Sequence, residues 1–142
     1  MRWQLLAFAA GVAGLGVSIY LTFVHYSSIP LACPANAVVN CEQVLLSSYG
    51  VIGGSSVPTS AAGIVWFGVS ALLAAGLLVG RGGLARFQMA WAALGLATVL
   101  FLVYVEIVQL GAVCVWCTAA HLLVLVIFLV SLPRPNEGRV RS

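Results

Sequence analysis

Residues 107–133 read IVQLGAVCVWCTAAHLLVLVIFLVSLP, a stretch with no charged side chain that carries two cysteines near its start. A helix that crosses a membrane needs about 20 mostly apolar residues. The stretch exceeds that length, so we predict a membrane span over about residues 112–132. The cysteines then lie at the beginning of the last span.

The whole chain is similarly apolar. Of its 142 residues, 63% are hydrophobic and 6% are charged, whereas soluble domains carry about 25% charged residues. This composition excludes an ordinary soluble domain, and it excludes a disordered chain, which needs low hydrophobicity and high charge. The net charge of +3 comes from scattered arginines, not from a basic stripe, which argues against nucleic-acid binding. We expect an integral membrane protein.

Three further spans are predicted, over about residues 3–24, 61–80 and 85–109. Clusters of Ser, Pro and Gly between the first two of these divide one long apolar region into a span, a loop and a second span. The predicted fold is therefore an all-α membrane protein with a single domain, a four-transmembrane-helix bundle.

Two segments lie outside these spans. An outer cap loop is predicted over about residues 25–60, and a cytoplasmic tail over residues 133–142. The first span is longer than the roughly 7–15 apolar residues of a signal peptide, so we expect it to be retained.

The arginines predict the orientation. All six lie on one side of the four-span arrangement: Arg2, Arg81, Arg86, Arg134, Arg139 and Arg141. Because Lys and Arg concentrate in cytoplasmic loops, both chain termini are predicted to be cytoplasmic. The cap loop and the short loop at 110–112 then face outward, and all four cysteines lie on the outer side.

The cap loop is predicted to contain a short amphipathic helix. In the sequence Asn40-Cys41-Glu42-Gln43, Asn40 suits the N-cap position and Gln43 suits the third helical position, a variant of the capping box. A one-face pattern then continues with Val44, Leu45 and Ser48, and Gly50 suits the end of the helix.

The four cysteines, Cys33, Cys41, Cys114 and Cys117, are the strongest functional signal. An oxidising outer compartment permits disulfides, and four cysteines allow three pairings, among them one local pair in each segment or bonds that link the segments. A helix N-terminus stabilises a thiolate, and both Cys41 and Cys114 have that position. Cys117 lies one turn deeper, where a lipid-soluble ligand would sit.

Two readings of the cysteines without redox chemistry remain open. One is a redox-inert four-span scaffold with structural disulfides, although a bond within Cys-x-x-Cys closes a loop too small to stabilise a fold much. The other is a zinc site held by four thiolates. The seven-residue spacing between Cys33 and Cys41 is wide for such a site, so no metal is expected.

The order of these motifs resembles the vitamin K epoxide reductase family. The resemblance covers nearly the whole chain: Cys33-x7-Cys41, then Ser47 and Gly50, then apolar spans of which the last opens with Cys114-x-x-Cys117. Bacterial members of that family are four-helix oxidants of thiols that pass electrons to a quinone. The DsbB family has its Cys-x-x-Cys in the first outer loop and its second pair in a long second loop, the reverse of this order.

The resemblance implies a relay. Cys33 and Cys41 would exchange electrons with a separate thioredoxin-like (DsbA-like) protein in the periplasm or outside the cell. Cys41 would form a transient bond with Cys114, and Cys117 would lie beside a quinone of the menaquinone, ubiquinone or vitamin K type. The implied location is the cytoplasmic membrane of a bacterium or archaeon. Reduction of vitamin K epoxide is not implied.

The resemblance also suggests contacts to the quinone. Ser47 matches a family serine near the pocket, while Thr59 or Ser60 falls where vertebrate relatives have an asparagine that binds the quinone carbonyl. His121 replaces a vertebrate tyrosine. Trp66 is a further candidate for the pocket lining, with simple packing as its alternative.

Two titratable residues are candidates for proton relay. Glu106 is the only acid within a predicted span, and its alternative role is to extend toward water at the outer end. His121 lies one helical turn after Cys117, on the same face, with a packing hydrogen bond as its alternative. Small residues are expected to permit close helix contacts, and they are Gly11, Gly14, Gly63, Gly68, Ala93 and Ala97.

Overall fold

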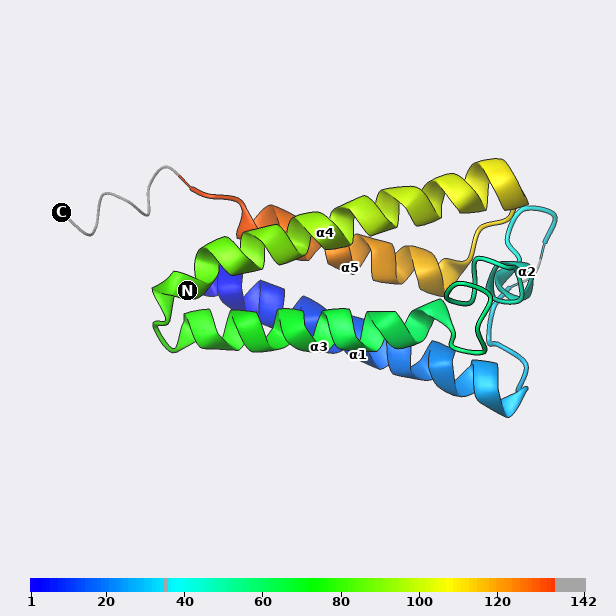
Figure 1. The fold of residues 1–142 in the computed structure, drawn as a ribbon, viewed down its shortest axis with the longest axis horizontal. Helices are drawn as coiled ribbons and strands as arrows, with labels where there is room; N and C mark the ends of the chain where they lie inside the picture. Colours follow the sequence, from blue (N-terminus) through cyan, green and yellow to red (C-terminus); the bar gives the residue numbers. More distant parts are fainter. Residues whose placement is uncertain (35, 135–142) are drawn as a thin grey trace.

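A computed structural model describes residues 1–34 and 36–134 and shows an elongated helical bundle (Figure 1). Its long helices are α1 (Arg2–Ser27), α3 (Thr59–Leu78), α4 (Ala85–Tyr104) and α5 (Val115–Ser131). The short elements are α2 (Cys41–Leu45), the 3-10 turn η1 (Gly82–Leu84) and the π-helical turn η2 (Val105–Leu110). Most of the tail predicted for 133–142 lies outside the described residues.

Among the described residues, three stretches of helix are long and apolar enough to cross a membrane: Arg2–Ser27, Thr59–Leu78 and the continuous run Gly82–Leu110. The helix α5 is apolar but shorter, with 17 residues. Large apolar side chains face outward along the bundle, for example Leu72 at 73% exposure and Leu100 at 63%. Such an exterior suits lipid, as expected for an integral membrane protein.

In the core of the bundle, large side chains pack against small residues on neighbouring helices. Phe67 of α3 packs with Ala10, Ala92, Val124 and Ile127 in one buried cluster. A side chain at Gly14 would overlap the Phe67 ring, so glycine permits α1 and α3 to approach closely.

Some of the predicted small-residue contacts are wrong. Gly11, Gly14 and Gly63 do face other helices, but nothing lies within 4 Å of the position a side chain would take at Gly68. Ala93 and Ala97 are exposed on α4, where the buried face carries Ala92 and Gly95 instead. The uniformly apolar sequence of α4 gives no polar stripe that distinguishes its faces.

The predicted loop helix exists but is shorter than expected. Asn40 is its N-cap, and the Asn40 side chain accepts a hydrogen bond from the Gln43 N–H at 3.0 Å. The helix ends at Leu45 rather than near Gly50, because the Ser47 hydroxyl donates to the Val44 carbonyl at 2.7 Å and the chain turns there.

The last helix begins later than the predicted span. The chain leaves η2 at Gly111, which has a left-handed backbone with φ 60°. Val113 and Cys114 are then extended, and Val113 pairs with Val39 of the cap in an isolated parallel β-bridge. Because Val113 bonds to the cap and the Cys114 N–H donates to the Glu106 carboxylate, these residues do not join α5, which begins at Val115.

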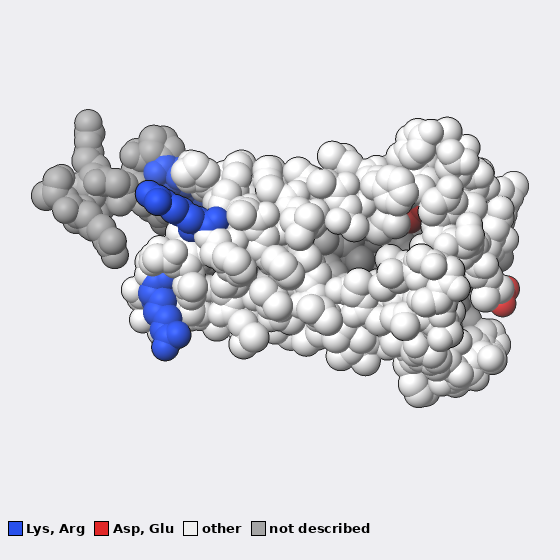
Figure 2. Space-filling model, viewed as in Figure 1, with Lys and Arg blue, Asp and Glu red and all other residues white. Residues whose placement is uncertain are grey.

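The two ends of the bundle differ in charge. The N-terminus (Figure 1) and the basic side chains visible in Figure 2 lie at one end, whereas the acidic atoms lie toward the other. The cap with α2 occupies that second end (Figure 1). The cap and all four cysteines are therefore at the end of the bundle opposite the arginines that the structure describes.

Candidate redox site and cavity

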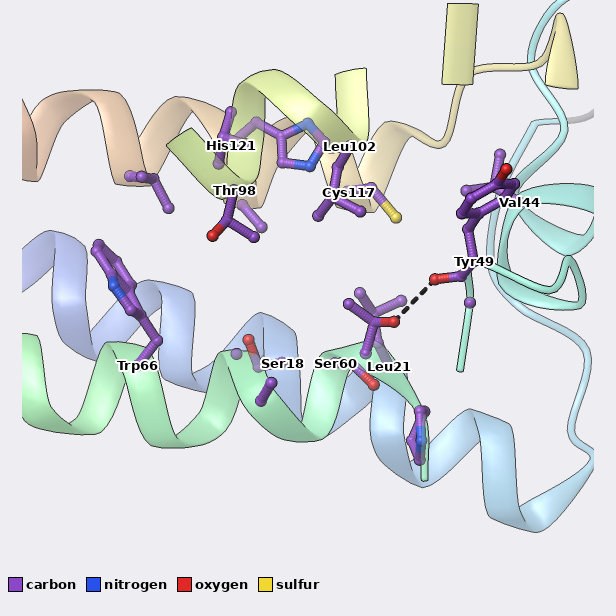
Figure 3. Close-up of a pocket in the computed structure, with 18 of the residues that line it drawn as sticks. Ser18, Leu21, Val44, Tyr49, Ser60, Trp66, Thr98, Leu102, Cys117 and His121 are labelled. Carbon is purple, nitrogen blue, oxygen red and sulfur yellow. Dashed lines mark hydrogen bonds between the residues drawn. The ribbon is translucent and has the colours of Figure 1, made fainter. Parts of the chain in front are cut away.

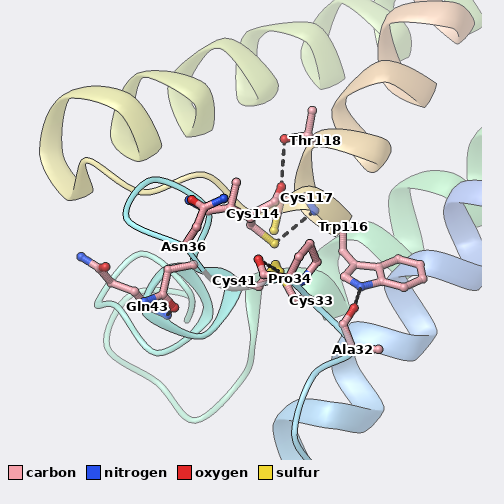
Figure 4. Close-up of a disulfide and its surroundings, with 12 residues drawn as sticks. Ala32, Cys33, Pro34, Asn36, Cys41, Gln43, Cys114, Trp116, Cys117 and Thr118 are labelled. Atoms are coloured by element: carbon pink, nitrogen blue, oxygen red, sulfur yellow. Dashed lines mark hydrogen bonds between the residues drawn. A yellow bond between two sulfur atoms is a disulfide. The ribbon is translucent and has the colours of Figure 1, made fainter.

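The cysteines form one disulfide and one pair of free thiols. Cys33 and Cys41 are bonded to each other, with their Cα atoms 6.4 Å apart. Cys114 and Cys117 are not bonded. Figure 4 shows the disulfide facing the Cys114 side chain. Because two of the four thiols are used in the loop bond, the four thiolates of the zinc alternative are not assembled here.

Backbone hydrogen bonds hold the cap against the turn between η2 and α5. The Asn40 N–H donates to the Val113 carbonyl at 3.1 Å, and the Val113 N–H donates to the Val38 carbonyl at 2.9 Å. The Gln43 amide donates to the Leu110 carbonyl at 3.2 Å. Gln43 therefore does not complete a reciprocal capping box with Asn40. It fixes α2, and with it Cys41, beside the Cys114 segment.

Cys114 is set up as the more acidic thiol of its pair. It is the N-cap residue ahead of α5, outside the membrane-spanning helices, and its side chain is fully buried. The Cys117 N–H donates to the Cys114 sulfur at 3.2 Å. The hydrogen bond from the Cys117 side chain, helped by the Cys117 and Trp116 N–H groups, holds the pKa of the Cys114 thiol below its usual value.

A cavity of about 560 Å³ lies directly below the cap, between the helices (Figure 3). The cavity is lined by every predicted quinone-contact and proton-relay residue: Ser47, Thr59, Ser60, Trp66, Glu106, Cys117 and His121. Most of the other lining side chains are apolar. Figure 2 shows a hollow in the surface between α3 and α4, two helices that make few contacts with each other.

The predicted hydroxyl contacts already have partners within the protein. Thr59 donates to the Tyr49 carbonyl at 2.9 Å, and the Ser60 and Thr22 hydroxyls are 2.9 Å apart. Ser47 donates within the cap, as described above. Among the described residues drawn in Figure 3, none forms a hydrogen bond with His121, whose ring points into the cavity. His121 is thus better placed than the hydroxyls to donate to a ligand.

Residues 5–132 match the profile of the vitamin K epoxide reductase family. The chain belongs to this family. The match runs from α1 through α5, so membership covers nearly the whole chain and makes it a membrane protein of an oxidoreductase family. A search of curated proteins found no match.

Glu106 is buried in this family member. Its side chain is 5% exposed, and its carboxylate accepts a hydrogen bond from the Cys114 N–H at 3.3 Å. Glu106 therefore does not extend toward water, the alternative considered from the sequence. Glu106 belongs to the π-helical turn η2. Short π-helical turns of this kind are frequent at functional sites.

Trp66 has both of the roles considered for it. It lines the cavity, and it is bonded to Trp91 of α4 by two reciprocal hydrogen bonds. Each indole N–H donates to the backbone carbonyl of the other tryptophan, at 3.3 and 3.2 Å, and the rings stack with centroids 6.4 Å apart. The pair joins α3 to α4 at the inner end of the cavity.

Sequence reasoning missed the α4 side of the cavity. Trp91, Gly95, Thr98 and Leu102 all line it. Their spacing of four, three and four residues defines one face of a helix, and that periodicity was the available signal.

Proposed function

We propose that this protein oxidises thiols outside the cytoplasm and passes their electrons to a membrane quinone. The net reaction converts a donor dithiol and a quinone into a donor disulfide and a quinol. One observation carries the proposal: an intact loop disulfide faces Cys114 of a free Cys-x-x-Cys pair (Figure 4), and the second cysteine of that pair, Cys117, lines a mostly apolar cavity.

The proposed topology has four spans. Arg2–Ser27, Thr59–Leu78 and Gly82–Leu110 have the required length, and the 17 residues of α5 are at the lower limit for a fourth span. The arginines at one end of the bundle favour cytoplasmic termini and an outward-facing cap. The cysteines would then meet an oxidising compartment, where a separate thioredoxin-like protein supplies the thiols.

The first exchange takes place at the loop disulfide. Cys41 is 2% exposed, whereas Cys33 is partly exposed, so a thiolate of the partner reaches Cys33 more readily. Attack on Cys33 forms a mixed disulfide and releases the Cys41 thiolate. The second thiol of the partner then breaks the mixed disulfide, and the partner leaves in its oxidised form.

The second exchange regenerates the loop bond. The Cys41 thiolate attacks Cys114 of a Cys114–Cys117 disulfide and releases Cys117. Cys33 then closes onto Cys41 and releases Cys114. The product has a loop disulfide and a free Cys114/Cys117 pair, which is the redox state of the structure. Both steps are thiol–disulfide exchanges, so the number of disulfides is conserved.

The cavity fits the last step. A bound quinone supplies an acceptor for two electrons and two protons. Cys117 reaches the cavity beside His121 and Glu106, at its polar end, while Trp66 and Trp91 line the apolar end. The polar end suits a quinone ring and the apolar end suits an isoprenoid tail. Re-forming the Cys114–Cys117 bond releases two electrons and two protons, and we assign proton transfer to Glu106 and His121.

The test is thiol-dependent quinone reduction. The purified protein in detergent receives a reduced thioredoxin-like donor and a short-chain ubiquinone or menadione, and quinone absorbance is followed. We expect turnover that is lost in Cys117→Ser and lost for the protein donor in Cys33→Ala. Met89→Leu, a substitution outside the cavity lining, serves as the control with normal turnover. Turnover that survives Cys117→Ser contradicts the relay.

The redox-inert scaffold makes the opposite prediction. A protein whose loop disulfide is only structural shows no quinone reduction with any thiol donor, and its Cys33–Cys41 bond persists when the donor is added. Quantifying free thiols by mass after alkylation therefore separates the two functions even if the tested quinone is a poor acceptor.

A further inference from the structure

Ala32, the residue before Cys33, is held from two sides by aromatic residues. The Trp116 indole N–H donates to the Ala32 carbonyl at 2.9 Å (Figure 4). The Ala32 N–H donates to the Tyr20 hydroxyl at 3.3 Å. The Tyr20 and Trp116 rings contact each other, with centroids 4.9 Å apart. We call Tyr20 and Trp116 the aromatic clamp.

The two cysteines of the loop disulfide are therefore held by separate groups. Cys41 begins α2, which is fixed to the α5 turn by the Asn40 and Gln43 hydrogen bonds. Cys33 lies in a segment without helix or strand, and the clamp bonds both the N–H and the carbonyl of its neighbour Ala32. Trp116 belongs to α5 and lies between Cys114 and Cys117, so one short motif also holds the Cys33 segment.

We propose that Trp116, together with Tyr20, is a positioning residue that keeps Cys33 within reach of Cys41 when the loop disulfide is open. The role in catalysis rests on the proposed function, because only a relay opens this bond in every cycle. The clamp bonds to backbone atoms of Ala32 rather than to sulfur. It can therefore persist in the reduced protein and during exchange with the partner.

The clamp raises the effective concentration of the Cys33 thiol near the Cys41 thiol. A segment that is fixed at Ala32 loses little further conformational freedom when Cys33 closes onto Cys41, so the bond forms more favourably. Without the clamp, the closure must also order the segment. We expect loss of one clamp hydrogen bond to lower the equilibrium constant for forming the disulfide about fivefold.

The test measures the loop pair alone. In a Cys114→Ala/Cys117→Ala background, the Cys33/Cys41 pair is equilibrated with mixtures of reduced and oxidised glutathione and then alkylated. Trp116→Phe keeps a ring against Tyr20 but removes the N–H, and Tyr20→Phe removes the hydroxyl acceptor. Each is expected to make the disulfide about fivefold easier to reduce, a shift of about 20 mV to less negative potential.

The matched control is Trp3→Phe. Trp3 is 51% exposed, and its ring lies under the Arg134 guanidinium at the opposite end of the bundle. The reduction potential of the Cys33–Cys41 disulfide in the Trp3→Phe variant should equal that of the background protein. Helix content and melting temperature are measured for each variant, and Tyr20→Phe carries the test if Trp116→Phe does not fold.

Loop potentials of Trp116→Phe and Tyr20→Phe that equal the Trp3→Phe value overturn the proposal. The measurement uses neither quinone nor partner. A wild-type protein that fails to reduce quinone therefore contradicts the proposed function, while a shifted loop potential still supports the clamp.

Discussion

Glu106 accepts a hydrogen bond from the backbone N–H of Cys114 at 3.3 Å, across the turn that separates the third and fourth long helices. The bond joins the only acid within the spans to the residue that begins the Cys-x-x-Cys motif. Both side chains are buried, and Glu106 also lines the cavity that Cys117 reaches. The acid is therefore in place to exchange protons with the reacting thiols or with a bound quinone.

Glu106→Gln tests that role. The glutamine side chain has nearly the same shape, and its amide oxygen can accept the same hydrogen bond, but it cannot take up or release a proton. We expect quinone reduction to slow roughly 100-fold, as for loss of a general acid–base group. The measurement is kcat with a fixed short-chain quinone across a range of pH.

The matched control for this change is Glu42→Gln, because Glu42 is exposed in the first turn of α2. It should leave kcat within about twofold of wild type. If Glu106→Gln and Glu42→Gln have equal kcat values at every pH, Glu106 has no part in proton transfer.

Cys117→Ser is expected to accumulate a Cys41–Cys114 disulfide. The Cys114 thiolate attacks Cys41 of the loop bond and releases Cys33, and Cys117 is no longer present to attack Cys114 and resolve the new bond. Iodoacetamide alkylates the released Cys33, which can then no longer attack the Cys41–Cys114 disulfide. Peptide mapping without reductant identifies the new bond. Recovery of only Cys33–Cys41 peptides contradicts the proposed contact between the two pairs.

The same exchange should depend on pH through the Cys114 thiol. Its pKa lies below the usual value chiefly because the Cys117 side chain donates a hydrogen bond to it. A lower pKa keeps more reactive thiolate as the pH falls. Serine at position 117 can still donate, whereas alanine cannot. The rate midpoint of Cys117→Ala should therefore lie at higher pH than that of Cys117→Ser, and identical midpoints contradict this explanation.

Gly95→Ala is expected to disturb the apolar end of the cavity. A side chain at Gly95 would overlap the Trp66 indole, which must shift or break its hydrogen bonds with Trp91. We expect a loss of about 1–3 kcal/mol in stability and a raised KM for quinone. Thermal unfolding in detergent and quinone titration measure the two effects.

Gly68→Ala is the control for that substitution, since nothing lies within 4 Å of the added carbon. It replaces a helical glycine with a better helix former and should be neutral or slightly stabilising. Equal melting temperatures for Gly95→Ala and Gly68→Ala would show that the position of the Trp66 indole does not exclude a larger side chain at position 95.

Local chemistry in the sequence predicted the features that depend on a few neighbouring residues. Asn40 does cap α2, because a side-chain acceptor at that position needs only the N–H groups of the next turn. The family assignment was confirmed. The predicted quinone-contact and proton-relay residues also line one cavity, because Cys117, His121 and Glu106 lie near the same ends of neighbouring helices.

Features that depend on distant partners were not predictable in this way. Apolar periodicity does not distinguish a π-helical turn from an α-helical one, so the orientation of Glu106 toward Cys114 was not foreseen. The late start of α5 follows from the pairing of Val113 with Val39. The bond from Trp116 to Ala32 joins residues 84 positions apart, for which one sequence holds no signal.

These long separations have a consequence for biosynthesis. The groups that hold the cap, Leu110, Val113 and Trp116, are made after the loop that contains Cys33 and Cys41 has left the ribosome. Until these residues are made, the loop has only Tyr20 of the clamp to hold it, so we expect the two loop thiols to be open to pairing with other proteins. Maturation of the cap therefore depends on completion of the chain, and a truncated protein that stops before α5 would carry an unprotected, reactive cysteine pair.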